Sequence, residues 1–375
     1  MSGCVTGLVN LWSNSEMSEL KPRTVLANAE GQRYRIVREI GAGGFGRVYL
    51  AHRLFGAEDQ QAVAVKVCST PRDWHGEAFY GELLARERGV VRVLDSFAHP
   101  VGKSRIGYVL VSELMSEGTV ADRVEDSDGP LWSESRVRSR ISALLILLAK
   151  MHEAGITHRD IKPSNVYVRN GALVLGDFGI SKMTLGVQRS EVDAWTPAFS
   201  PRDVGDGFLW GPAVDVFQVG LLTATLLTGT VWQTDDLAGL RHSQIADDLM
   251  CWIWHTTSPK ARRYQSAREA AHALNTLGRD TMAPGRFPSR LANQHVVLTG
   301  RIDGMTRKDA IGGLMRAGAR VQETVTNETS LLIRGTVRNV LGETEGRKLF
   351  AVRERRRTGQ KIHIVSGGQL VRALS

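Results

Sequence analysis

Hydrophobic residues along the chain follow two different spacings, which divide it near Asp122. Before this point, apolar residues gather in short runs with the composition of strands, at 34–37, 48–50, 63–67 and 108–111. Beyond it they recur every three or four positions, which predicts helices over 136–152, 215–227 and 267–277. The pattern predicts a small sheet-rich lobe followed by a larger helical lobe. Residues 1–32 lack such periodicity and are expected to form a flexible or loosely docked tail.

Residues 278–293 contain prolines and glycines that predict a linker, and a new alternation of strands and helices begins after them. Beyond the linker, strands are expected at 296–298, 331–333 and 362–365, with helices at 306–317 and 343–356. Strands that alternate with helices favour a compact parallel sheet with helices on its faces, over about 294–375. All eight tryptophans lie before the linker, in agreement with two independently built domains.

The composition fits a globular protein with a sizeable core, because 42% of the residues are hydrophobic. The first twenty residues contain no Lys or Arg and no sustained apolar run, so no signal peptide is expected. The most apolar runs, 141–149 and 219–227, are about half the length required to cross a bilayer. The three cysteines are scattered, which argues against a disulfide framework or a zinc site. A cytoplasmic protein without a membrane partner is the simplest expectation.

Charge is distributed unevenly along the chain. Residues 286–375 contain 17 Lys and Arg against 7 Asp and Glu, whereas the rest of the chain contains 31 basic and 32 acidic residues. The whole basic excess therefore lies in the last quarter. An anionic partner for this segment and a merely solvated basic surface are both consistent with the asymmetry.

A glycine-rich segment between two predicted strands suits phosphate binding. Its candidate contacts are Gly41, Gly43, Gly44, Phe45, Gly46 and Val48. Glycine lets the backbone approach phosphate oxygens and present N–H groups to them. Because residues 47–50 continue as a strand, the segment differs from a dinucleotide-binding turn, which opens a helix. Ala64 and Lys66 lie on the next strand, where a buried lysine requires an anion such as a nucleotide phosphate.

The strongest chemical pattern is His-Arg-Asp-Ile-Lys-Pro-Ser-Asn at 158–165, followed by Asp-Phe-Gly at 177–179. Phosphoryl transfer needs an oriented hydroxyl, a positive group on the moving phosphoryl group, and Mg²⁺ on the phosphates. Asp160 is expected to accept the proton of a substrate hydroxyl, and Lys162 to neutralise charge on the transferred group. Asn165 and Asp177 offer the hard oxygen ligands that Mg²⁺ prefers. These residues predict an enzyme that transfers phosphoryl from ATP to protein hydroxyls.

With these motifs, residues 33–277 resemble the eukaryotic-type protein Ser/Thr kinase family in its bacterial form. The resemblance implies an α+β two-lobed fold, with an N-lobe over about 33–115, a C-lobe over about 116–277 and ATP between them. It also implies that Glu113 and Met115 lie in the hinge that binds adenine, and that Asp215 braces the catalytic loop.

The kinase family pairs its strand lysine with a helix glutamate, for which this chain offers Glu77 and Glu82. Glu77 is preferred, because Leu84 lies on the same helix face as Glu77. Counted from Glu82, that face would present Arg86 and Gly89, which would pack poorly.

The chain departs from the family where the activation segment closes. The family has Ala-Pro-Glu, whose glutamate pairs with a buried arginine, whereas this chain has Ser-Pro-Arg at 200–202 with Arg263 as the expected partner. Two arginines cannot pair, so the base of the segment must be held differently. Arg159 beside Asp160 is the arrangement that reads a phosphate on this segment, and the candidate phosphorylation sites are Thr184, Ser190 and Thr196. Thr196 also fits a different role, which is contact with Asp160 and Lys162.

The C-terminal module, about 294–375, resembles the BRCT domain family, particularly the copy in bacterial NAD-dependent DNA ligases. The resemblance rests on a strand that leads directly into Thr299-Gly300, a helix opening at Thr306, and the strands and helix that follow. It implies a phosphate site at Thr299, Gly300 and Lys348, with Arg347 as an alternative to the lysine. Its ligand would be a phosphoprotein or a 5′-phosphorylated DNA end. Pure protein contact, including self-association into a homodimer, is the alternative.

The sequence thus predicts a protein Ser/Thr kinase that uses ATP and Mg²⁺ on a protein substrate and is directed by its C-terminal module. Bacterial DNA-damage or phage-defence signalling is the biological hypothesis, because the two modules share one chain. The alternatives are a pseudokinase scaffold, supported by Arg202, and an adaptor that mainly binds DNA or phosphoprotein.

Overall fold

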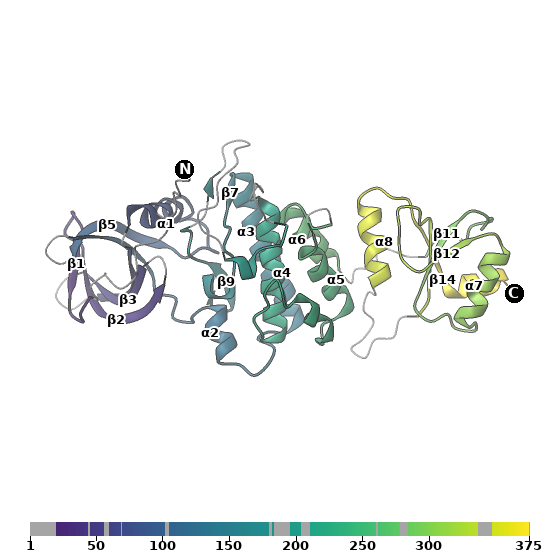
Figure 1. Cartoon of the computed structure of the whole chain (residues 1–375), viewed down its shortest axis with the longest axis horizontal. Helices are drawn as coiled ribbons and strands as arrows, with labels where there is room; N and C mark the ends of the chain where they lie inside the picture. The colour runs from purple at the N-terminus through teal and green to yellow at the C-terminus, as the bar shows by residue number, and fades with distance from the viewer. Residues whose placement is uncertain are drawn as a thin grey trace, which may run out of the picture.

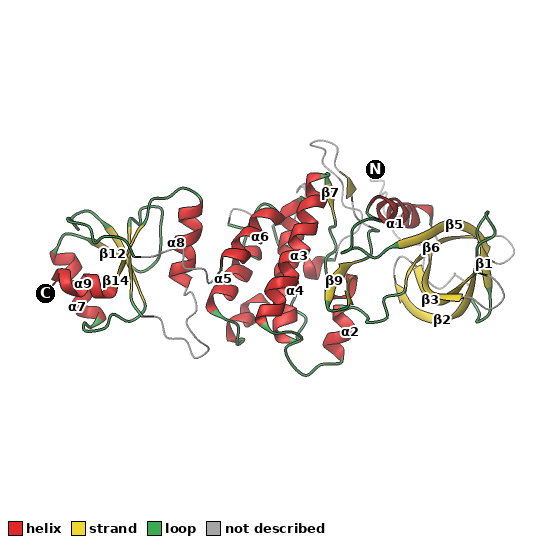
Figure 2. Ribbon diagram, turned by 180° about the vertical axis from the view of Figure 1, so that it is seen from behind, coloured by secondary structure: helices red, strands yellow, loops and turns green. Residues whose placement is uncertain are grey.

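The computed structural model describes residues 20–43, 46–55, 60–68, 70–101, 105–179, 182–183, 196–203, 211–259, 262–277, 284–336 and 347–374. A six-stranded sheet, a group of helices and a second, four-stranded sheet follow one another along its longest axis (Figures 1 and 2). No helix among the described residues is both long and apolar enough to cross a bilayer.

The first sheet is antiparallel throughout, in the order β1-β2-β3-β4-β6-β5. Its strands are β1 (Val25–Ala27), β2 (Arg33–Gly43), β3 (Gly46–Leu54), β4 (Gln60–Cys68), β5 (Val93–Val101) and β6 (Arg105–Glu113). Helix α1 (Pro71–Leu83) packs against β6, where the indole nitrogen of Trp74 donates to the carbonyl of Val109 at 3.0 Å. This contact fixes α1 against the sheet.

The part of the predicted tail that the structure describes, residues 20–32, is built into this lobe. Strand β1 pairs with β2, and Leu20 packs against the buried residues of the sheet while its N–H donates to the Tyr49 hydroxyl. A three-residue strand is too short to produce a recognisable alternation, which is why the pattern does not reveal it.

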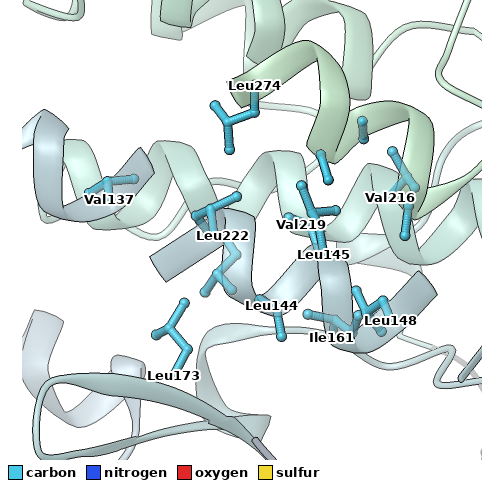
Figure 3. Close-up of a cluster of buried hydrophobic side chains, with 14 of the residues drawn as sticks. Val137, Leu144, Leu145, Leu148, Ile161, Leu173, Val216, Val219, Leu222 and Leu274 are labelled. Carbon is cyan, nitrogen blue, oxygen red and sulfur yellow. The ribbon is translucent and has the colours of Figure 1, made fainter. Parts of the chain in front are cut away.

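The second lobe is mainly helical. Its helices are α2 (Val120–Glu125), α3 (Glu134–Glu153), α4 (Pro212–Thr228), α5 (Asp247–Thr256) and α6 (Ala267–Thr276). Apolar side chains from α3, α4 and α6 meet in one core, among them Leu145, Val219 and Leu274 (Figure 3). Every residue from Val214 to Leu227 in α4 is buried, so this helix forms the centre of the lobe.

Short strands and turns on the side facing the first lobe carry the polar motifs. The strands are β7 (Ile156–Thr157), β8 (Val166–Arg169), β9 (Ala172–Leu175) and β10 (Lys182–Met183). The 3₁₀ turns Pro163–Asn165 and Pro197–Phe199 lie among them, whereas a third turn, Leu237–His242, follows α4. Strand β8 pairs with β9, so the segments that precede and follow this hairpin are brought close together.

The C-terminal module has a fully parallel sheet in the order β12-β11-β13-β14. The strands are β11 (His295–Thr299), β12 (Arg320–Gln322), β13 (Leu331–Arg334) and β14 (His363–Ser366), with helices α7 (Arg307–Arg316), α8 (Arg347–Arg357) and α9 (Gly367–Leu374). Alternate residues of β11 enter two different cores, one containing Leu314 of α7 and Leu370 of α9, the other containing Leu349 of α8. The predicted parallel sheet with a helix on each face is therefore present.

The described part of the predicted linker, residues 284–293, packs with this module. The amide of Gly285 donates to the carbonyl of Ile364 at 2.8 Å, and Leu291 is buried in the core beside α7. The module therefore begins close to residue 285, and residues 278–283 lie outside the described part of the chain.

Candidate active site

The catalytic loop, residues 158–165, is held by two buried polar side chains of helix α4. The carboxylate of Asp215 accepts from the backbone amides of His158 and Arg159 at 2.9 and 2.8 Å. One turn later, Gln218 accepts from the amide of Ile161 at 2.9 Å and donates to the carbonyl of Arg159 at 3.0 Å. Because these polar groups are buried, losing one partner would leave the other unsatisfied, and the loop is rigidly placed.

Burial alone would raise the pKa of Asp215, but hydrogen bonds from His152 and from the backbone hold it below its ordinary value. Asp215 is therefore ionised, and its carboxylate accepts hydrogen bonds from His152 and from the backbone of the catalytic loop. This geometry is the bracing role that the kinase resemblance implies for Asp215.

Both carboxylate oxygens of Asp160 are engaged. Thr196 donates its hydroxyl to one oxygen at 2.7 Å, and the side-chain amide of Asn165 donates to the other at 2.8 Å. Lys162 lies 2.8 Å from the second oxygen and also donates to the Thr196 hydroxyl at 2.9 Å. The site therefore unites four residues from the catalytic loop and from the turn at 196–199.

Two residues of this region have positive φ although they are not glycine. Arg159 has φ of 74° and Asp177 has φ of 57°, a conformation that costs energy for residues with a side chain. Such strain persists where the surrounding structure determines it, and it concentrates at functional sites. Here it falls immediately before Asp160 and on the aspartate of the Asp-Phe-Gly sequence.

Lys66 on β4 contributes a second ammonium group, on the side of the first lobe. It forms an ion pair with Glu77 of α1 and lies 3.6 Å from a carboxylate oxygen of Asp177. Glu77 is 6% exposed, whereas Glu82 faces solvent. The structure therefore pairs Lys66 with the glutamate that the helix-face argument favours.

Lys66, Glu77 and Asp177 shift one another's pKa values. Burial raises the pKa of Glu77 to about 7, and the carboxylate of Asp177 acts in the same direction. Burial would lower the pKa of Lys66, but the two carboxylates raise it above its ordinary value. Burial would likewise raise the pKa of Asp177, which Lys66 keeps low. Two carboxylates thus share one ammonium group, and the site can accept further positive charge.

A run of rings connects α1 with the catalytic loop. Phe178 is buried, with its ring centroid 6.5 Å from that of Tyr80 on α1 and 4.8 Å from that of His158. The position of α1, which supplies Glu77, is therefore tied to the segment that supplies Asp177.

The glycine-rich segment forms the turn between β2 and β3. Gly41 pairs with Val48 and Gly43 with Gly46, while Gly44 and Phe45 lie outside the described residues. Gly46 has φ of 141°, and a Cβ atom there would lie 2.3 Å from the Val67 carbonyl oxygen. Only glycine fits this close approach of β3 to β4.

The predicted hinge lies at the end of β6. Glu113 accepts from the guanidinium of Arg169 at 2.6 Å and from the amide of Arg92 at 2.9 Å, which links the hinge to β8 of the second lobe. The carbonyl of Met115 accepts from the amide of Gly118 at 3.1 Å, while Ala64 is half-buried on β4. These positions surround the region between the two lobes.

The donor set suits a nucleotide with a divalent cation. Asn165 uses its amide nitrogen on Asp160, which leaves its side-chain oxygen as the atom that can bind a cation. The side chain of Asp177 is 30% exposed and its carboxylate can supply the second oxygen ligand, and Lys66 can contact a phosphate. The residues present therefore fit both groups.

Comparison with known proteins agrees with this geometry. A family profile described as a protein kinase domain matches residues 34–283, which is two thirds of the 375 residues. The chain belongs to the protein kinase domain family. The kinase family predicted from the sequence motifs is thereby confirmed, together with the protein kinase fold of the first two lobes.

Several curated kinases are similar to this kinase domain. Serine/threonine-protein kinase PknA of Nostoc sp. is 29% identical over 246 residues, which covers 60% of this chain and 40% of that protein. Serine/threonine-protein kinase F of Synechocystis sp. is 29% identical over 283 residues, covering 65% and 55%. Mouse calcium/calmodulin-dependent protein kinase type IV is 34% identical over 124 residues, covering 32% and 26%. The chain spans between 24% and 57% of the length of these and similar curated relatives.

The base of the activation segment is held by Asp203, one position after the residue that the comparison with Ala-Pro-Glu indicates. Arg202 is exposed and pairs with Asp235 on the surface, whereas Asp203 accepts two hydrogen bonds from the buried guanidinium of Arg263, at 2.9 and 3.1 Å. Arg263 therefore pairs with a carboxylate, that of Asp203, as the family's arginine pairs with a glutamate. Of the three candidate phosphorylation sites, Thr184 and Ser190 lie outside the described residues, and the Thr196 hydroxyl is engaged in the site.

In the C-terminal module, two cations meet at the end of β11. Lys348 Nζ and the guanidinium of Arg307 both donate to the carbonyl of Leu298, at 3.1 and 3.2 Å. Burial, together with the nearby charge of Arg307, lowers the pKa of Lys348. Thr299 and Gly300 follow directly. Gly300 has φ of 73°, and a Cβ atom there would lie 2.8 Å from the Thr336 carbonyl oxygen. Packing alone therefore explains a glycine at this position.

Three residues of these sites were not predicted from the sequence. Gln218 lies one turn beyond Asp215 in a mostly apolar helix, and this spacing could have revealed it. Asp203 lies one residue after Arg202, the position at which the family has its glutamate. Arg307 is the first residue of α7, and nothing in its sequence context distinguishes it from the neighbouring Lys308.

Proposed function

We propose that this chain is a protein serine/threonine kinase that transfers the γ-phosphoryl group of ATP to hydroxyl groups of a protein substrate. The observation that carries the proposal is the arrangement around Asp160. Its carboxylate is fixed on both oxygens by Thr196 and Asn165, and Lys162 lies beside it. A carboxylate offers about four acceptor positions, so a substrate hydroxyl can be received beside the bonds already made.

In this mechanism Asp160 orients the substrate hydroxyl and accepts its proton. The ammonium group of Lys162, 2.8 Å from Asp160, neutralises negative charge on the transferred group. Lys66, oriented by Glu77, binds the phosphates of ATP. Because Asp215 fixes the loop backbone, these groups need little rearrangement during the reaction.

The remaining residues bind and orient the nucleotide. The turn at Gly41–Val48 would cover the phosphates, while Ala64, Glu113 and Met115 would bound the adenine. Bound Mg²⁺ would supply positive charge on the phosphates, and Asn165 and Asp177 are the residues that would hold it.

A pseudokinase scaffold is the competing proposal, and its support was the arginine at position 202. The pair between Asp203 and Arg263 weakens that support, because the base of the segment has its acid–arginine contact after all. Incubation with Mg-ATP, followed by mass spectrometry of the protein and of casein, separates the two proposals. Phosphate on serine or threonine supports the kinase, and its absence supports the scaffold.

A second function is supported by the two cations at Leu298. Ammonium and guanidinium groups that converge on one carbonyl repel each other, and a bound anion would relieve this repulsion. We therefore propose that Thr299, Gly300, Lys348 and Arg307 bind a phosphate group of a phosphoprotein or of a 5′-phosphorylated DNA end. Such a module beside a kinase domain supports a role in DNA-damage or phage-defence signalling.

Titration of the full chain with a phosphopeptide library and with 5′-phosphorylated duplex identifies the ligand, with the unphosphorylated forms as controls. Binding that requires the phosphate supports the site. Equal binding of phosphorylated and unphosphorylated forms would favour the alternative, a module for protein contact such as homodimer formation.

A further inference from the structure

Helix α8 of the C-terminal module is buried on two sides, in two different domains. Leu349 and Val352 enter the core of the module beneath its sheet. Phe350, one residue away, is 2% exposed and belongs instead to the core of the kinase C-lobe. Residues 349 and 350 differ by about 100° around a helix, so the two faces of α8 serve the two domains.

The contact with the kinase domain is specific. The ring of Phe350 lies 5.2 Å from the imidazole of His255 on α5, and α8 faces α5 in both views of the chain (Figures 1 and 2). The guanidinium of Arg353, one turn further along α8, donates to the carbonyl of Thr276 at 2.8 Å. Thr276 ends α6, where backbone carbonyls lack helical partners, so Arg353 satisfies a group of the kinase domain.

From this contact, ring contacts, an ion pair and short stretches of chain lead to the activation segment. The imidazole of His255 stacks on Tyr264, with centroids 5.5 Å apart. The next residue back, Arg263, holds Asp203 through two hydrogen bonds. Asp203 lies seven positions after Thr196, which contacts Asp160. The docked module is thus connected to residues 196–203 through His255, Tyr264 and the Arg263–Asp203 pair.

We propose that the surface formed by α5 and the end of α6 is the docking site for the chain's own C-terminal module, and that the docked module stabilises the Arg263–Asp203 anchor of the activation segment. Phe350 is the central docking residue, and Arg353 fixes the orientation. The dependence of catalysis on docking rests on the proposed kinase function, whereas the effect on the anchor does not.

The test compares Phe350→Ala with wild type in the full chain. Amide hydrogen exchange measures opening of α5 and of residues 196–203, and transfer to casein measures activity. We expect faster exchange in both segments and slower transfer by about twofold to thirtyfold, the range of couplings through packed side chains. The affinity for an ATP analogue should stay within about twofold, because Phe350 does not contact the nucleotide site.

Two further variants serve as controls. Phe350→Leu keeps an apolar contact and should be intermediate, and Arg356→Ala changes an exposed residue of the same helix and should behave like wild type. The inference is overturned if Phe350→Ala speeds exchange of α5 but leaves residues 196–203 unchanged. It is equally overturned if exchange of α5 does not respond, since the docking contact would then be absent. A wild-type chain without transfer activity would refute the kinase proposal. The exchange data would still test whether the docked module stabilises the Arg263–Asp203 pair.

Discussion

The guanidinium of Arg263 donates to both carboxylate oxygens of Asp203, at 2.9 and 3.1 Å. The Arg263 side chain is 1% exposed, and its plane lies over the ring of Phe217 at 5.1 Å. A buried guanidinium needs a nearby anion, and Asp203 supplies it although the preceding residue has the wrong charge. The end of the activation segment is therefore held to the second lobe by the Arg263–Asp203 pair.

Asp203→Asn is expected to destabilise the protein by about 3 kcal/mol, because it leaves a buried charge without its partner. Arg202→Ala removes an exposed pair and should cost less than about 0.5 kcal/mol. Denaturant unfolding of both variants measures the difference. Equal losses would show that the anchor does not depend on position 203.

Glu77→Gln is expected to lower kcat/KM for transfer by about a hundredfold, since Lys66 would lose the group that orients it toward the phosphates. Glu82→Gln, on the exposed side of the same helix, is the matched control and should stay close to wild type. Steady-state kinetics with Mg-ATP distinguishes the two. A larger effect at position 82 would contradict the pairing.

Stability should fall in mild acid partly because of His158. Burial lowers the pKa of its imidazole below the ordinary 6.5, although the carboxylates of Asp215, Asp160 and Asp177 oppose this shift. The native imidazole takes up its proton at lower pH than the unfolded one, so the unfolding free energy falls as pH falls below about 6.5, by at most about 1.4 kcal/mol per pH unit.

His158→Phe removes this titration. Its unfolding free energy should therefore decline less than that of wild type between about pH 7.5 and 5.5, by about 1 kcal/mol. Phenylalanine also loses the hydrogen bond to the Gly176 carbonyl, but that loss is the same at every pH. Urea unfolding at three pH values measures both effects, and parallel pH profiles would rule out His158 as the cause.

Arg307→Ala and Lys348→Ala should each weaken binding of a phosphorylated ligand to the C-terminal module. With 5′-phosphorylated duplex, each variant should reduce the slope of log affinity against log salt by about one, because one phosphate contact is lost. Lys308→Ala, beside Arg307 but without its contact to Leu298, is the control. An unchanged slope in both variants would remove the phosphate site.

The motifs could be recognised from the sequence because their spacing is fixed by chemistry. Asp160, Lys162 and Asn165 lie on one short loop, so their order alone places them together. Glu77 could be selected because helix faces follow from periodicity. Position 203 could not be selected, because the end of the activation segment is irregular and its register follows from tertiary contacts.

The relation between the two domains was also beyond the sequence pattern. Leu349 and Phe350 are adjacent apolar residues on a strongly basic helix, and nothing local shows that they enter different cores. Arg307 and Lys348 are 41 positions apart and meet only because α7 and α8 both begin beside the end of β11. These features depend on how separate elements pack.

The most direct test of the kinase proposal is the initial rate of labelled phosphoryl transfer from Mg-ATP to casein by wild type and by Asp160→Asn. Asparagine keeps the size of the side chain but is a far weaker proton acceptor, so the rate should fall by about a hundredfold to ten-thousandfold. Binding of an ATP analogue should persist in both proteins. A wild-type chain that transfers no phosphate, or an Asp160→Asn variant as fast as wild type, would contradict the account.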